Sequence, residues 1–157
     1  METAIIQYDY ETERGKPMPS KIHAFCQKRI LVQLENQYGK LYEPLPELSI
    51  VVDGRKKVPD ISIYEKGVLN MAREEITVEE MPLAAIEILS PQQYLSDLIE
   101  KSLIYLQKGV KSYWLVIPEL KSVYVFHQPE AYIVFTQEDV VRDQILDITL
   151  DLKHVFF

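Results

Sequence analysis

The feature that most constrains the fold is an apolar run at residues 83–89 (Leu-Ala-Ala-Ile-Glu-Ile-Leu), which carries a single charge at Glu87. Near-continuous apolar runs of this length are typical of strands buried on both faces of a sheet. A helix is predicted to start at Ser90 and Pro91 or at Ser96, and Gly109 is suited to end it. Residues 113–117 (Tyr-Trp-Leu-Val-Ile) then predict a second buried strand. The segment is therefore predicted to form a strand–helix–strand unit with parallel strands.

The rest of the chain supplies one helix and several further strands. A helix is predicted from Ser20 to about Tyr38, because apolar residues recur there at helical spacing. A hairpin is predicted from strands at 48–52 and 58–64 around a turn at 53–57, and residues 4–10 and 123–126 are predicted to be extended. Two edge strands are expected at 132–135 and 145–152. The second helix is expected to bury Leu95, Leu98, Ile99, Ser102 and Leu106. The order predicts a mixed α/β sheet flanked by helices.

Length and composition favour one soluble domain spanning residues 1–157. A chain of 157 residues with 47% hydrophobic and 26% charged residues can bury a full core without disulfides. The longest stretch free of charged side chains is nine residues, 88–96, which is far below the roughly 18 to 20 that a membrane span needs. No secretory signal is apparent, and the single cysteine, Cys26, reads as a core thiol. We therefore expect a cytoplasmic protein with no membrane association.

Several common active sites are excluded by spacing. The five glycines are isolated, so no glycine-rich phosphate loop exists. His23, His127 and His154 are too scattered to suggest a zinc site, and no G-x-S-x-G elbow is present. A net charge of −7 also argues against a protein that coats nucleic acid through bulk electrostatics.

Glu87 is the residue that needs a special explanation, because an ionised carboxylate on a buried strand is costly unless something compensates it. A divalent cation shared with a second carboxylate would suffice. Asp60 is the candidate, since Pro59 and Asp60 open the preceding apolar strand. Two oxygen ligands on neighbouring strands suit Mg²⁺, which keeps several waters. The alternative is a salt bridge between Glu87 and a Lys or Arg of a helix.

Lys101 is the third candidate. Helical spacing places Tyr94, Asp97, Lys101, Tyr105 and Lys108 along one edge of the second helix. From there the long Lys101 side chain could reach the carboxyl end of the Glu87 strand. The alternative is that Asp97 and Lys101 form a surface ion pair, which is worth only about 0.3 to 0.5 kcal/mol.

These residues resemble a known family. Pro59-Asp60, then 26 residues, then Glu87-Ile88-Leu89 resembles the PD-(D/E)XK nuclease superfamily, with Leu89 where the lysine would stand. In the Uma-two family of bacterial restriction-endonuclease-like proteins, that lysine comes from the next helix. A series of residues in the same order as in that family follows: Ser90, Pro91, Asp97, Lys101, Tyr105, Gly109, Tyr113 and Trp114. The likeness extends to Glu11, Gly15 and His23 near the start of the chain.

The resemblance implies a restriction-endonuclease-like mixed sheet flanked by helices and a Mg²⁺-dependent DNA endonuclease, with Mn²⁺ able to substitute. Asp60, Glu87 and the carbonyl of Ile88 would hold the metal, and Lys101 would orient or deprotonate the attacking water. Asp97, Tyr105 and Ser90 would support the site.

The basic turn at Arg55, Lys56 and Lys57 is a candidate phosphate contact, although a solvated turn is the simpler interpretation. DNA binding is expected to be weak without metal. The alternative function is a non-catalytic binding module for nucleic acid or protein that keeps the nuclease fold, as a homodimer through its β-rich tail.

Overall fold

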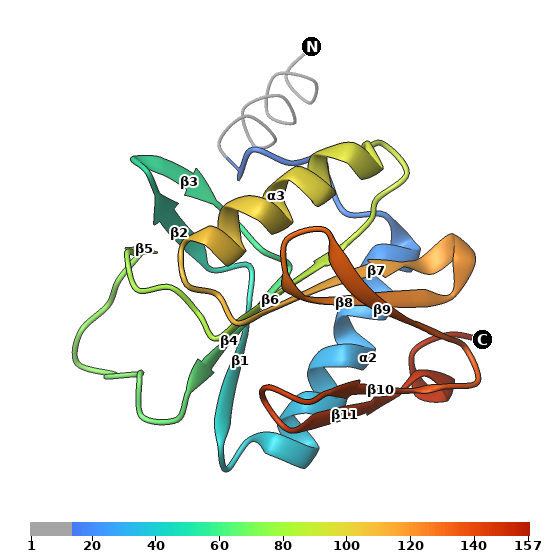
Figure 1. Ribbon diagram of the computed structural model, residues 1–157. Helices are drawn as coiled ribbons and strands as arrows, with labels where there is room; N and C mark the ends of the chain where they lie inside the picture. The colour runs from blue at the N-terminus through green and yellow to red at the C-terminus, as the bar shows by residue number, and fades with distance from the viewer. Residues whose placement is uncertain (1–13) are drawn as a thin grey trace.

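The computed structural model describes residues 14–157, so the strand expected at 4–10 and Glu11 lie outside the described residues. Two long helices, α2 (Lys21–Tyr38) and α3 (Leu95–Gln107), lie on opposite sides of a six-stranded sheet (Figure 1). The sheet has the order β1-β4-β6-β7-β8-β9. Its strands are β1 Tyr42–Pro46, β4 Ile61–Glu65, β6 Ala84–Ile88, β7 Ser112–Ile117, β8 Ser122–Gln128 and β9 Ala131–Thr136. The predicted mixed α/β fold is confirmed.

The strand β6 lies inside this sheet and is buried along its whole length, as its apolar run predicted. It pairs in parallel with β7, from Ala84 opposite Ser112 to Ile88 opposite Val116. The other neighbouring strands of the sheet run antiparallel. Helix α3 connects β6 to β7, so the predicted strand–helix–strand unit is confirmed.

Each helix closes its own hydrophobic core. Helix α2 begins at its predicted cap, because the Ser20 hydroxyl accepts a hydrogen bond from the His23 N–H at 3.1 Å. It packs Cys26, Ile30 and Leu34 on the face that carries Ile86 and Ile88. Helix α3 packs on the opposite face, which carries Ala85, Tyr113 and Leu115. Strand alternation therefore directs Glu87, which shares the parity of Ala85, towards α3.

The predicted hairpin was wrong in its second strand. Strand β2 (Ser49–Val52) pairs with β3 (Arg55–Lys57) and with β5 (Thr77–Val78) in a small separate sheet. The turn is only two residues long, because Asp53 (φ 51°) and Gly54 (φ 75°) both adopt the left-handed conformation that tight hairpins require. The segment expected to be a turn is therefore partly strand, and β4 joins the main sheet between β1 and β6.

Two further expectations need correction. Residues 145–152 do not form an edge of the main sheet: β11 (Ile148–Asp151) pairs with β10 (Val140–Asp143) in a separate two-stranded sheet. Asp143 stabilises the turn between them, since its Oδ1 accepts hydrogen bonds from the N–H groups of Ile145 and Leu146. The edge strand expected at 132–135 is confirmed as β9.

The buried face of α3 is also rotated from the predicted one. Leu95 and Ile99 are each 42% exposed, whereas Leu98, Ser102 and Tyr105 are buried. The helix begins at Leu95, after a separate turn in which the Ser90 N–H donates to Gln93 Oε1 at 3.1 Å. The Ser90 signal therefore marks this turn and not the start of the helix. Within residues 14–157, no helix is both long and apolar enough to cross a membrane.

Candidate active site

Asp60 and Glu87 come from neighbouring antiparallel strands. Asp60 stands directly before β4, one position beyond the register pair that joins Ile61 to Ile86, and that position lies opposite Glu87 of β6. Both carboxylates are buried, with Asp60 1% and Glu87 0% exposed. The structure therefore brings the two predicted carboxylates together in the interior.

Asp60 is fully engaged by hydrogen bonds. Its Oδ1 lies 2.6 Å from Lys16 Nζ and 3.1 Å from His23 Nε2, and its Oδ2 accepts from the Ile88 N–H at 2.7 Å. Burial opposes ionisation, but the His23 hydrogen bond and the Lys16 charge outweigh it and hold the pKa of Asp60 below its ordinary value. Asp60 is therefore an anion at neutral pH.

A third carboxylate, Glu47, joins this group, and sequence reasoning missed it. Lys16 Nζ lies 3.0 Å from Glu47 Oε2, and Arg14 also pairs with Glu47. The Gln27 amide donates to Glu47 Oε1 at 3.0 Å and to the Asp60 carbonyl at 2.8 Å. Glu47 adopts φ 58°, a conformation that is uncommon for residues other than glycine and concentrates at functional sites. We call Asp60, Lys16, His23, Gln27 and Glu47 the Asp60 cluster.

A sequence signal for Glu47 did exist. It directly follows Pro46, and both Pro44 and Pro46 lie in β1, where prolines are tolerated because β1 is the edge strand beside β4. Recognising that edge strand would have placed Glu47 next to Asp60. Lys16 gave no comparable signal, because it lies in a polar turn.

Glu87 has the opposite environment. Both of its carboxylate oxygens are buried without a hydrogen-bond partner among the described residues, and Lys101 Nζ lies 3.8 Å from Oε1. Burial raises the pKa of Glu87 to about 8; the charge of Lys101 opposes this shift and that of Asp60 adds to it. The alternative prediction for Glu87, a salt bridge to a lysine of a helix, is therefore also observed, with Lys101 as the partner. A perturbed carboxylate beside a specific charge partner is a candidate functional group.

The supporting residues are divided between the interior and the surface. Tyr105 lies one turn after Lys101 on α3 and is 1% exposed, with a buried hydroxyl that has no hydrogen-bond partner among the described residues. Burial and the nearby charges of Glu87 and Asp60 raise its pKa. Ser90 is buried and lines the same hollow as Asp60. Asp97 is exposed and forms no ion pair with any described residue, so the expected Asp97–Lys101 pair is not formed; Lys101 turns towards Glu87 instead.

The basic residues at 55–57 do not join the site. Arg55 and Lys56 are exposed on β3 and Lys57 is half-buried there, and none of them contacts Asp60 or Glu87. The structure therefore leaves them on the small separate sheet.

The donor set suits a hard divalent cation, although it does not form a ready-made cage. Within the described part of the chain, no three His, Cys, Asp or Glu residues are placed together to hold a metal. The two partnerless oxygens of Glu87 are nevertheless the kind of ligand that Mg²⁺ and Mn²⁺ prefer, and Mg²⁺ often takes only one or two protein carboxylates. Asp60 could contribute through Oδ2, which accepts one hydrogen bond, whereas its Oδ1 is already contacted by Lys16 and His23. The residues fit a metal centred on Glu87.

A family comparison decides the classification of this chain. Residues 7–153 match the family model "Uma2: Putative restriction endonuclease". The chain belongs to the Uma2 family. The resemblance found in the sequence is thereby confirmed, and the match spans both carboxylates and Lys101.

A solved structure shares the fold of this chain. A crystal structure described as "a putative nuclease" from Anabaena variabilis is 24% identical, covers 89% of this chain and 83% of its own, and has a TM-score of 0.77. At that identity it shows a shared fold. A cryo-EM structure of a DrdV–DNA complex has 12% identity and a TM-score of 0.39 over 72% of this chain and 12% of that one, too low to support an inference. A search of curated proteins found no match.

Proposed function

We propose that this protein is a metal-dependent nuclease that hydrolyses DNA phosphodiester bonds. The observation that carries the proposal is Glu87: it is fully buried, its two carboxylate oxygens have no hydrogen-bond partner within residues 14–157, and Lys101 lies 3.8 Å away. It also lies opposite Asp60 on the neighbouring strand. A purely structural carboxylate would be expected to have its oxygens hydrogen-bonded. Membership in the Uma2 family gives the reaction class.

Asp60, Glu87 and the carbonyl of Ile88 are the residues that would hold Mg²⁺ or Mn²⁺. When bound, such an ion polarises a phosphoryl oxygen and lowers the pKa of water. Glu87 would be ionised in that state, because a nearby cation favours the charged carboxylate.

Lys101 is the proposed proton-handling group. Its side chain is 16% exposed, so the ammonium borders both the buried carboxylates and solvent. From that position it can hold the attacking water by hydrogen bonding and take part in removing its proton. Lys16, which carries a second positive charge beside Asp60, would stabilise charge that develops on the phosphate.

Cleavage assays test the proposal directly. Purified protein is incubated with supercoiled plasmid and with single-stranded DNA, with Mg²⁺, with Mn²⁺ and with chelator. Metal-dependent cleavage that Glu87→Gln abolishes is the expected result. Asp143→Asn is the matched control, because Asp143 is also a buried carboxylate but hydrogen-bonds Trp114 away from the site. Cleavage by the Glu87→Gln protein at the unchanged rate would contradict the proposal.

Metal binding provides a test without cleavage. Calorimetric titration of Mn²⁺ should show binding to the unaltered protein and to Asp143→Asn, and loss of binding in Glu87→Ala and Asp60→Ala. Equal Mn²⁺ binding by all four proteins would place the metal elsewhere.

DNA affinity should depend on the metal more than on basic side chains. The net charge of −7 opposes the phosphate backbone, and a bound divalent ion would offset the carboxylate charges locally. Fluorescence anisotropy of a labelled duplex should therefore show tighter binding in Ca²⁺ than in chelator, with a shallow salt dependence. Equal affinity in both would indicate an unrecognised basic binding surface.

One observation favours the alternative of a non-catalytic binding module. Lys16 already neutralises Asp60 at 2.6 Å, so this carboxylate is satisfied without metal. The homodimer belongs to the same alternative, and it is supported by the edge strand β9, where Tyr132, Ile133 and Val134 are 55%, 55% and 45% exposed. Monomeric protein by light scattering, together with metal-dependent cleavage, would exclude this alternative.

A further inference from the structure

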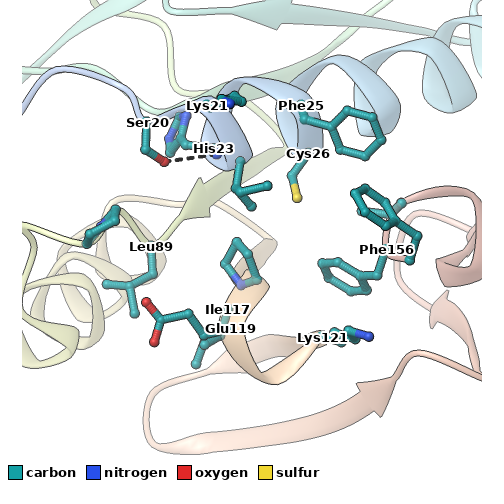
Figure 2. Close-up of a pocket in the computed structure, with 15 residues that line it drawn as sticks. Ser20, Lys21, His23, Phe25, Cys26, Leu89, Ile117, Glu119, Lys121 and Phe156 are labelled. Carbon is teal, nitrogen blue, oxygen red and sulfur yellow. Dashed lines mark hydrogen bonds between the residues drawn. The ribbon is translucent and has the colours of Figure 1, made fainter.

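A cavity of about 430 Å³ lies beside the Asp60 cluster and has no role in the chemistry proposed above. Its walls come from the first turns of α2, the segment after β6, the end of β7 and the C-terminal residues. Figure 2 shows Phe25 and Cys26 on the α2 side, Leu89 on the opposite side and Phe156 near the C-terminal end. The volume lies in the range of small-ligand pockets, which are usually apolar with a few polar groups.

The cavity and the Asp60 hollow share a wall. The Asp60 hollow is lined by Pro19, Ser90 and Gln93, whereas Ser20, Leu89 and Pro91, their neighbours in the chain, line the cavity. His23 lines both spaces, and its Nε2 lies 3.1 Å from Asp60 Oδ1. A ligand in the cavity would therefore be separated from the candidate active site by only one layer of side chains.

The side chains that line the cavity indicate which kind of chemical group it can bind. Its aromatic side chains are Phe25, Phe156 and Phe157, and aromatic walls suit a flat ring. The Phe25 and Phe157 rings already meet edge to face with centroids 5.4 Å apart, and Lys28 and Arg29 lie over Phe25. The exposed Glu119 carboxylate also lines it (Figure 2) and can accept hydrogen bonds from ring N–H or amino groups.

The charged residues that line the cavity are exposed and comprise two lysines and one glutamate, Lys21, Lys121 and Glu119. Lys21 and Lys121 line it from different elements, and neither forms an ion pair with a described residue. Two free ammonium groups around an aromatic cavity complement a ligand whose flat, neutral part enters while its negative part stays outside.

We propose that this cavity binds one unstacked nucleobase of a single DNA strand, next to the phosphate that lies at the Asp60 and Glu87 site. The proposal rests on the proposed nuclease function for the identity of the ligand, and it adds that the protein acts on a strand whose bases can leave the stack. Extruding a base is least costly when the base is unpaired, so single-stranded DNA is the preferred substrate class.

Abasic oligonucleotides test this proposal without relying on cleavage. The probe is a set of labelled single-stranded 12-mers in which one nucleotide, at a different place in each, lacks its base. Affinity is measured by anisotropy in Ca²⁺ and in chelator. We expect the loss of one particular base to weaken binding about 5-fold to 100-fold, the range for one stacked base, while loss at distant positions has little effect.

Two phenylalanine variants localise the effect. Phe25→Ala removes an aromatic wall and should bring the ratio of intact to abasic affinity close to 1. Phe135→Ala is the matched control, because Phe135 is also half-buried against the α2 core but does not line the cavity; it should keep the ratio. Thermal denaturation establishes that both variants are folded.

The outcomes separate this proposal from the proposed function. Affinity that no abasic position changes, no detectable binding of any 12-mer, or equal loss of the ratio in both variants would overturn the base pocket. A position-specific abasic effect that Phe25→Ala removes would support the pocket, even if no DNA is cleaved in Mn²⁺, and in that case the nuclease function alone would fail. Cleavage of single-stranded DNA without any abasic effect would leave the nuclease function standing and remove the pocket.

Discussion

The two carboxylates of the candidate site lie on neighbouring strands, yet their surroundings differ in kind. Asp60 receives hydrogen bonds from Lys16, His23 and the Ile88 backbone, and its pKa is lowered. Glu87 receives none from the residues that the structure describes, and burial raises its pKa to about 8. Carboxylates whose environments push their pKa values apart are a recurrent feature of sites with divided roles. The contrast suggests that Asp60 organises the site, whereas Glu87 is the group left available for a ligand.

The largest expected effect is on stability, at Asp60. Asp60→Ala should lower the free energy of unfolding by about 3 to 5 kcal/mol, because it removes the nearer of the two carboxylates that pair with the buried Lys16 ammonium and leaves only Glu47, 3.0 Å away. Urea denaturation measures the change. The control is Lys108→Ala, which breaks an exposed ion pair with Asp53 and should cost less than about 1 kcal/mol. Equal losses would mean that Asp60 does not organise the interior.

The next effect is on activity, at Lys101. Lys101→Met should lower DNA cleavage by about 10²-fold or more while leaving the melting temperature nearly unchanged, because Glu87 can remain protonated without its partner. Cleavage rates and thermal denaturation are measured on the same preparations. Lys108→Met serves as the control, since Lys108 pairs with Asp53 on the surface. If the Lys101 variant cleaves at the normal rate, Lys101 has no place in the mechanism.

The third prediction concerns pH and uses protein kept in chelator. The ordinary pKa of 4.5 applies to unfolded Glu87 and about 8 to the folded state, so between these values only the folded state holds the proton. The contribution of Glu87 to the free energy of unfolding should therefore decrease as pH rises from about 4.5 to about 8 and change little above it.

Glu87→Gln should remove this decrease and make the metal-free protein more stable than the unaltered protein at pH 8. Urea denaturation across the pH range gives the comparison, with Asp143→Asn as the control for a buried carboxylate outside the site. A pH dependence identical in Glu87→Gln and the unaltered protein would show that Glu87 is already ionised and compensated.

The smallest expected effect compares two tyrosines of the α3 core that stack with ring centroids 6.0 Å apart. The Tyr113 hydroxyl donates to the Leu98 carbonyl at 2.9 Å, whereas the Tyr105 hydroxyl has no partner among the described residues. Tyr113→Phe should cost about 1 kcal/mol, and Tyr105→Phe should be close to neutral. If Tyr105→Phe is neutral in stability and slows cleavage, its hydroxyl acts on the substrate. A loss for Tyr105→Phe as large as for Tyr113→Phe would mean that Tyr105 has a structural partner.

The sequence by itself determined the central strand–helix–strand unit and singled out Glu87 and Lys101 as residues of the site. The apolar run at 83–89, the Gly109 stop and the run at 113–117 specify the strand–helix–strand unit, since burial on both faces leaves a strand little choice of place. The same logic singled out Glu87, because one charge inside such a run must be compensated. Lys101 followed from helical spacing, which is a local property.

Only the tertiary structure decided which side chains surround Asp60 and Glu87. Lys16, His23 and Glu47 reach Asp60 from three segments distant in the chain, and no local periodicity encodes such a meeting. The rotation of α3, which brings Lys101 within reach of Glu87, was set by how the helix packs on the sheet. Strand order likewise moved β4 from a local hairpin into the main sheet. Local patterns fix which residues must be buried, whereas the choice of their partners depends on long-range packing that the whole chain decides together.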